Sequence, residues 1–199
     1  MTSAEFCEKL HILTGLMFGG GPAAEAGEPL PPLPEGPFRE TLLCFDRALA
    51  GHRDFLKGLY DIMVPQEASI SEGILLLARE QQGVCAYALE LSSGKVLYLD
   101  PAGAAEPLDL SLEDFLLYLT AIQSSGYLPC SGKVGHCRDL LEDRYSDRRL
   151  TGAAGEGAVY CFEEGVIIAV AGNDAYASAP ADSAMETFER VRSLEVDYF

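Results

Sequence analysis

The sequence predicts an α+β fold: a mainly antiparallel central sheet, made of a meander and a C-terminal hairpin and covered by helices. Two observations carry this prediction. Three apolar runs, each about as long as a strand and too short for an average helix, follow one another at residues 74–78, 84–91 and 96–99. Amphipathic helical patterns stand before and after them, most clearly at residues 111–123.

Polar breaks separate the three runs and predict hairpin turns. They lie at residues 79–83 and 92–95, and each carries a glycine, Gly83 or Gly94, at a position where a turn needs a positive φ. In the middle run both alternating faces are mostly apolar. We therefore expect a central strand that is covered on both faces.

The N-terminal part is predicted to be helical, with one irregular stretch. Residues 3–18 show an amphipathic pattern, with Ser3 as a candidate N-cap. The Gly- and Pro-rich stretch at 19–37 is typical of a linker or an extended loop. A second helix is predicted over residues 38–50, and a shorter third helix over residues 52–60.

The C-terminal part predicts further helices and a hairpin. In the helix at 111–123, Ser111 is the expected N-cap and Asp114 closes a capping box. A short helix is expected at 138–145. Two hairpin strands are expected at 158–162 and 166–171, and a short strand at 176–178. A last helix is expected from Ser183 onward.

Length and composition indicate one ordinary globular domain with an attached segment. The 199 residues are 48% hydrophobic and 23% charged, and a chain of this size buries roughly 70% of its unfolded surface. We expect residues 1–37, the N-terminal helix and linker, to pack on or flank the domain. Residues 38–199 are expected to form that single domain.

The charge limits the kinds of partner. The formal net charge is −17, and the nearest thing to a basic cluster, Arg148 with Arg149, is flanked by acids. We therefore expect no nucleic-acid partner. The acidic surface either keeps the chain soluble or steers it toward a basic protein.

The chain start and the cysteines favour a reducing cytoplasm. The first residues are acidic, no apolar leader core follows them, and no apolar run approaches a membrane span. The six cysteines are irregularly spaced, unlike those of a disulfide scaffold. Cys7, Cys44, Cys85 and Cys161 fall within predicted helices or strands, which is typical of small buried hydrophobes.

The candidate reactive residues are Cys130, His136 and Cys137. A cysteine beside a histidine can form a thiolate–imidazolium pair or begin a metal site. This spacing matches no zinc pattern, and no second Cys/His pair completes four ligands. We therefore expect no metal, no cofactor and no enzyme activity, and keep a thiol-dependent enzyme using these residues as a remote alternative.

The most informative polar segment is Glu80-Gln81-Gln82-Gly83. It is either a solvated turn or a place where long amides bridge backbone groups of neighbouring elements. With its surroundings, residues 70–89, it resembles the core motif of the SMI1/KNR4-like family, the SUKH superfamily. Glu80, Gln82 and Gly83 match the motif, Gln81 replaces the commoner Asn, and Tyr87 stands where a Trp is frequent.

This resemblance extends over roughly residues 33–125 and implies an interaction protein rather than an enzyme. Bacterial members of the family resemble immunity proteins that bind and neutralise a cognate toxin domain, often a nuclease. Fungal relatives are regulators of cell-wall synthesis and signalling, so a regulatory or scaffold module is the alternative. An acidic inhibitor suits a basic toxin domain, because its carboxylates can take the place of nucleic-acid phosphates.

Overall fold

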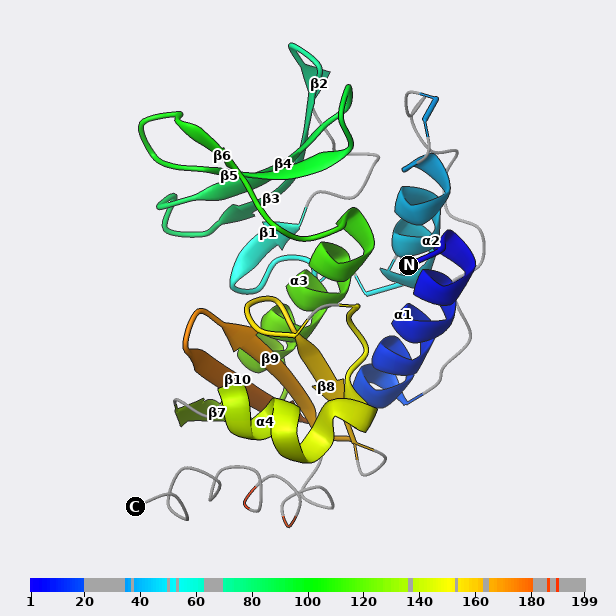
Figure 1. Cartoon of the computed structure of the whole chain (residues 1–199), viewed down its shortest axis with the longest axis vertical. Coiled ribbons are helices and arrows are strands. Elements are labelled where there is room, and N and C mark those ends of the chain that lie inside the picture. The colour runs from blue at the N-terminus through cyan, green and yellow to red at the C-terminus, as the bar shows by residue number, and fades with distance from the viewer. Residues whose placement is uncertain are drawn as a thin grey trace. The chain divides into compact units, whose positions relative to one another are not determined.

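A computed structural model represents the chain. It describes residues 1–19, 35–36, 38–49, 51–52, 54–62, 70–135, 138–152, 154–162 and 165–180, together with 186 and 189. The fold is α+β, as the sequence predicts (Figure 1). The chain divides into two compact units, one built from Met1–Glu8 and Pro22–Phe115 and the other from Lys9–Gly21 and Leu116–Phe199.

The first unit holds a six-stranded antiparallel sheet (Figure 1). Its strand order is β1-β3-β4-β5-β6, and β2 also pairs with β3. The strands are β1 (Tyr60–Ile62), β2 (Ile70–Ser71), β3 (Ile74–Glu80), β4 (Ala86–Glu90), β5 (Lys95–Leu99) and β6 (Ala105–Pro107). The predicted meander is thus confirmed as β3, β4 and β5, and β4 has the central position expected of it.

Three predicted helices are present with nearly the predicted bounds. They are α1 (Ser3–Phe18), α2 (Arg39–Leu49) and α3 (Leu112–Tyr127). The hydroxyl of Ser111 accepts the backbone N–H of Asp114 at 3.1 Å, which confirms the predicted N-cap of α3. The buried Thr41 of α2 donates to Glu113 of α3 at 2.8 Å and accepts a hydrogen bond from Ser3 of α1 at 3.1 Å.

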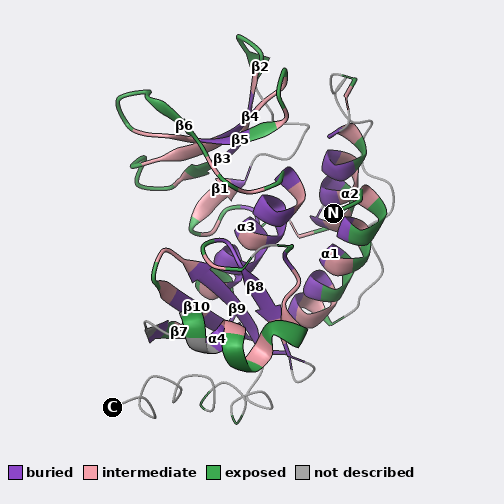
Figure 2. Ribbon diagram, in the orientation of Figure 1, coloured by how far each residue is buried: buried purple, intermediate pink, exposed green. Residues whose placement is uncertain are grey.

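The second unit holds a four-stranded antiparallel sheet of order β7-β10-β9-β8. Its elements are β7 (Cys130–Gly135), α4 (Arg138–Tyr145), the 3-10 helix η1 (Ser146–Arg148), β8 (Val159–Cys161), β9 (Ile167–Ala171) and β10 (Asp174–Ala179). The predicted hairpin corresponds to β8 and β9, and the predicted short strand is part of β10. Figure 2 shows β9 and β10 almost wholly buried, which marks them as the core of this unit.

Two local predictions at helix ends are wrong. The N-cap of α1 is Thr2 and not Ser3: the Thr2 hydroxyl accepts the N–H of Glu5, and the Glu5 carboxylate accepts the N–H of Thr2. The described residues of 52–60 form no third helix: residues 54–56 make a turn, Lys57 pairs with Asp61 in an isolated bridge, and Tyr60 begins β1. There the N–H of Ile62 bonds back to the carbonyl of Leu56 at 2.8 Å, so the chain reverses and joins the sheet as β1.

The interpretation of two cysteines is also wrong. Cys7 of α1 and Cys44 of α2 are joined by a disulfide, with their Cα atoms 5.9 Å apart, and both side chains are only partly buried. The sequence does not indicate this pairing, because the two cysteines are 37 positions apart and come together only when α1 packs against α2. Among the described cysteines, Cys85 and Cys161 are free.

Several predicted features lie outside the described residues. These are most of the linker at 19–37, the candidate residues His136 and Cys137, the turn residues Glu163 and Glu164, and nearly all of the helix predicted from Ser183. The domain boundary predicted at residue 37 also falls outside the described residues and stays a prediction.

Candidate protein-binding surface

The motif that carries the family resemblance forms a tight turn between β3 and β4. The Glu80 carboxylate accepts the backbone N–H of Gln82 at 2.7 Å and that of Val84 at 3.4 Å. Gly83 has a φ of 73° and donates its N–H to the carbonyl of Glu80 at 2.9 Å. The expected need for glycine at this position is confirmed, because other residues rarely adopt that φ.

Gln81 bridges this turn to a neighbouring element. Its side-chain amide donates to the carbonyl of Lys57 at 3.2 Å, and its backbone N–H donates to the carbonyl of Leu59 at 3.2 Å. This is the bridging role that the sequence suggests for a long amide here. It fixes the turn against the segment that leads into β1.

Tyr87 lies at the centre of an aromatic cluster in the first unit. Its ring centroid is 5.8 Å from that of Tyr60, 5.9 Å from that of Tyr98 and 5.1 Å from that of Phe115. Such separations suit edge-on and tilted aromatic packing. The four motif residues therefore build a turn and a core cluster, and the structure does not gather them into one group of reactive side chains.

The sheet of the first unit has one deeply buried face, here called the inner face. The strand register places Tyr87 and Tyr98 on it, and the contact with Phe115 shows that α3 begins against it. The aliphatic side chains that β3, β4 and β5 place on this face are at most 3% exposed. They are Leu75, Leu77, Ala78, Leu89 and Val96.

The opposite, outer face is apolar but only partly covered. The register lines up eight apolar residues across four strands: Ile74, Leu76, Ala86, Ala88, Leu97, Leu99, Ala105 and Pro107. Ala88 and Leu97 are buried, whereas the others are half-buried or exposed. The cover expected on both faces of β4 is largely present, because Ala88 is buried and Ala86 and Glu90 are half-buried; the exposed apolar positions of the outer face lie on β6. Figure 2 shows the resulting mixture of burial classes over this sheet.

Negative charge is concentrated in the same unit. By sequence, the first unit contains 18 acidic and 6 basic residues, and the second unit 13 acidic and 8 basic ones. Within residues 60–110, which contain the whole sheet, eight acidic residues stand against two basic ones. The sheet thus lies in an acidic part of the chain, to which a positively charged partner would be attracted.

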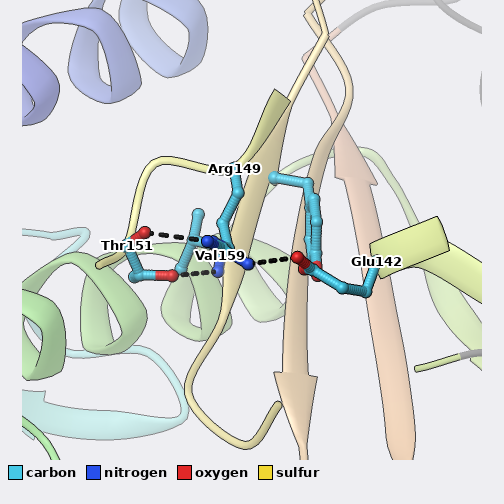
Figure 3. A network of polar contacts seen from close by, with 5 residues as sticks. Glu142, Arg149, Thr151 and Val159 are labelled. Atoms are coloured by element: carbon cyan, nitrogen blue, oxygen red, sulfur yellow. Dashed lines mark hydrogen bonds and ion pairs between the residues drawn. The ribbon is translucent and has the colours of Figure 1, made fainter. Parts of the chain in front are cut away.

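The second unit contains a polar network that sequence reasoning missed (Figure 3). Arg149 forms an ion pair with Glu142 of α4, and the Tyr160 hydroxyl donates to the other Glu142 oxygen at 2.8 Å. The Thr151 hydroxyl accepts the backbone N–H of Val159 at 3.2 Å. The network ties α4 and the following loop to β8, so we assign it a structural role.

Two of the described thiols, Cys85 and Cys161, are poorly suited to nucleophilic chemistry. Burial raises the pKa of Cys161 to about 12. Burial and the charge of Glu80 raise the pKa of Cys85, although a hydrogen bond with Tyr87 acts in the other direction. A thiol is nucleophilic as its thiolate, so a raised pKa lowers its reactivity near neutral pH. Cys130 lies in β7, and its two predicted companions fall outside the described residues.

The described residues contain neither a candidate metal-binding group nor a candidate membrane-spanning helix. No group of three or more His, Cys, Asp or Glu residues there could hold a metal ion. In the same part of the chain, no helix has the length and apolar character that crossing a membrane requires.

Comparison of the chain with protein-family models, with curated proteins and with solved structures gave no match. The first unit combines a partly exposed apolar sheet face with more acidic than basic residues in its sequence.

Proposed function

We propose that this chain is a non-enzymatic protein-binding module, an immunity protein of the SMI1/KNR4-like kind that neutralises a basic toxin domain. The observation that carries the proposal is the concentration of charge in the first unit, with 18 acidic against 6 basic residues. The motif resemblance at residues 70–89 supports it independently, because it comes from sequence order rather than from charge.

The geometry of the motif favours a scaffold role over catalysis. Glu80 and Gly83 are occupied in shaping a turn, and Tyr87 is packed among three aromatic rings. A general acid, base or nucleophile must instead reach a substrate atom. We keep the cytoplasm as the proposed compartment, where an inhibitor would meet a toxin that enters or is made in the same cell. The Cys7–Cys44 disulfide removes the cysteine argument for this compartment, because such bonds persist mainly where conditions are oxidising.

The test is a pull-down with the toxin domain encoded beside this chain's gene. The proposal predicts a complex at low ionic strength that weakens as salt is added, because exposed charges are screened. A neighbouring gene that encodes no toxin, or a toxin domain that fails to bind even at low salt, would count against the immunity role. In the same samples, slow iodoacetamide labelling of Cys130 and Cys137 in the native state would remove the thiol-enzyme alternative.

A further inference from the structure

We propose that a row of tyrosines on the inner face of the first unit's sheet is a docking surface, and that its occupant is an arginine side chain of a basic protein partner. The row consists of Tyr60, Tyr87 and Tyr98, and we call it the tyrosine row. The inference rests on the proposed function for the class of partner, and it adds the place and the chemistry of the contact.

The tyrosine row lies where the inner face reaches solvent. Tyr87 stands opposite Tyr98 in the register of β4 and β5, and its ring centroid is 5.8 Å from that of Tyr60 on β1. Further along the same face, Leu75 and Leu89 are at most 1% exposed, whereas all three tyrosines are half-buried. The three rings therefore offer a partner aromatic surface that the fold leaves partly uncovered.

The charges on this side of the sheet are not balanced within the sheet. The register sets Glu80 and Glu106 directly opposite the two outer members of the tyrosine row. Among the described strands of this sheet, the only basic residues are Arg79 and Lys95, and the same register places both on the outer face. A cation that approaches the tyrosine row therefore meets a carboxylate on either side of it.

An arginine side chain suits this combination of groups. The guanidinium is planar, stacks on aromatic rings and pairs with a carboxylate through two parallel N–H donors. Glu106 is exposed, and no residue that the structure describes forms an ion pair with its carboxylate. The carboxylate can therefore accept from the guanidinium while the ring of Tyr98, its cross-strand neighbour, stacks against it. Tyrosine and arginine are also residues enriched among the strongest contacts of protein interfaces.

The same carboxylates argue against two other occupants. Exposed tyrosines on a sheet can stack on the bases of a single-stranded nucleic acid, but Glu80 and Glu106 would repel its phosphates. A wholly apolar partner would bury these carboxylates without a counter-charge, which is unfavourable. A cationic side chain gains from both the rings and the carboxylates.

The first experiment uses a peptide of six arginines, so it does not depend on the toxin domain. Calorimetry measures its affinity, and a peptide of six citrullines, which lacks the charge, is expected not to bind. We expect Glu106→Gln to weaken binding of the arginine peptide by about threefold. Glu72→Gln removes the same charge at the exposed turn between β2 and β3, and it should weaken binding by less than about 1.5-fold.

Substitutions of Tyr98 test the ring itself. Tyr98→Leu removes it and should weaken binding by about twofold to fivefold, the usual effect of an exposed cation–π contact. Tyr98→Phe keeps the ring and should retain the wild-type affinity. Tyr127→Leu, at an exposed tyrosine of the second unit, is the matched control and should have no effect. Circular dichroism checks that each variant unfolds cooperatively.

Three outcomes would overturn the docking surface or its occupant. Equal weakening by Glu106→Gln and Glu72→Gln, or full affinity in Tyr98→Leu, would mean that the peptide binds through general charge alone. A single-stranded oligothymidine that binds the wild type but not Tyr98→Leu would assign the row to nucleic acid instead.

The purified toxin domain encoded beside this chain's gene then separates this inference from the proposed function. We expect Glu106→Gln and Tyr98→Leu to weaken its binding, with Glu72→Gln and Tyr127→Leu close to wild type. A toxin domain that binds all four variants equally would overturn the docking surface and leave the proposed function standing. A toxin domain that does not bind the wild type, beside an arginine peptide that behaves as expected, would overturn the proposed function and support the docking surface.

Discussion

The carboxylate of Glu80 accepts the backbone N–H of Gln82 at 2.7 Å, so the acidic residue of the motif holds its own turn closed. Replacing it should therefore affect stability. We expect Glu80→Ala to lower the free energy of unfolding by about 1 kcal/mol, because the turn amides lose their acceptor. Gln82→Ala, a change of an exposed side chain in the same turn, should stay within about 0.5 kcal/mol of wild type. Urea unfolding measures both, and equal losses would refute this role for Glu80.

Gly83 and Gly15 make a matched pair for testing backbone conformation. A Cβ would meet nothing within 4 Å at either position, but Gly83 has a φ of 73° whereas Gly15 is helical. Gly83→Ala should destabilise by about 1 kcal/mol or more through backbone strain. Gly15→Ala should stabilise α1 by up to about 1 kcal/mol. Thermal unfolding of the two variants checks the opposite signs, and shifts of the same sign would contradict the assignment.

The Cys7–Cys44 disulfide closes a sequence separation of 37 residues. Loss of such a link releases chain entropy in the unfolded state and typically costs about 2–4 kcal/mol. We expect the Cys7→Ser/Cys44→Ser variant to be destabilised by this amount, and dithiothreitol to destabilise the wild type to the same extent. The reductant should leave the double variant unchanged, which serves as the control. A wild-type protein that titrates with six free thiols when unfolded without reductant would show that the bond is absent.

The ion pair of Glu142 with Arg149 should make stability depend on acid pH. Burial raises the pKa of Glu142, but the hydrogen bonds from Arg149 and Tyr160 and the charge of Arg149 outweigh it and hold that pKa below its ordinary value. A lowered folded-state pKa contributes stability that is present above the unfolded-state pKa and is lost as the pH falls through the folded-state pKa.

Glu142→Gln isolates this contribution. Because the amide cannot ionise, we expect the wild type to exceed the variant in unfolding free energy by a constant amount at neutral pH. The difference should shrink below about pH 4.5, the ordinary value for a glutamate. Urea unfolding over a pH series measures the two curves, and curves that stay parallel down to low pH would contradict the coupling.

Local patterns predicted the elements whose signals are contained within a short stretch. The apolar runs at 74–99 became β3, β4 and β5, and Ser111 capped α3 as expected. In both cases the determining interaction is between residues a few positions apart, or between strands joined by a tight turn. Such interactions leave a period or a spacing that can be read directly from the sequence.

The features that sequence reasoning missed depend on contacts between distant positions. The Cys7–Cys44 bond exists because α1 and α2 lie together, and β7 carries too little apolar pattern to be recognised before it pairs with β10. For the candidate surface, the alternation in β4 correctly indicated apolar side chains on both faces. It could not show that the outer face would remain partly uncovered, because cover depends on the rest of the fold.

Calorimetric titration of the wild-type chain with the neighbouring toxin domain, over a range of temperature and salt, tests the central claim most directly. A basic partner bound by an acidic module predicts an affinity that falls as salt is added. A complex whose affinity does not change with salt, or no complex at low salt, would contradict the account.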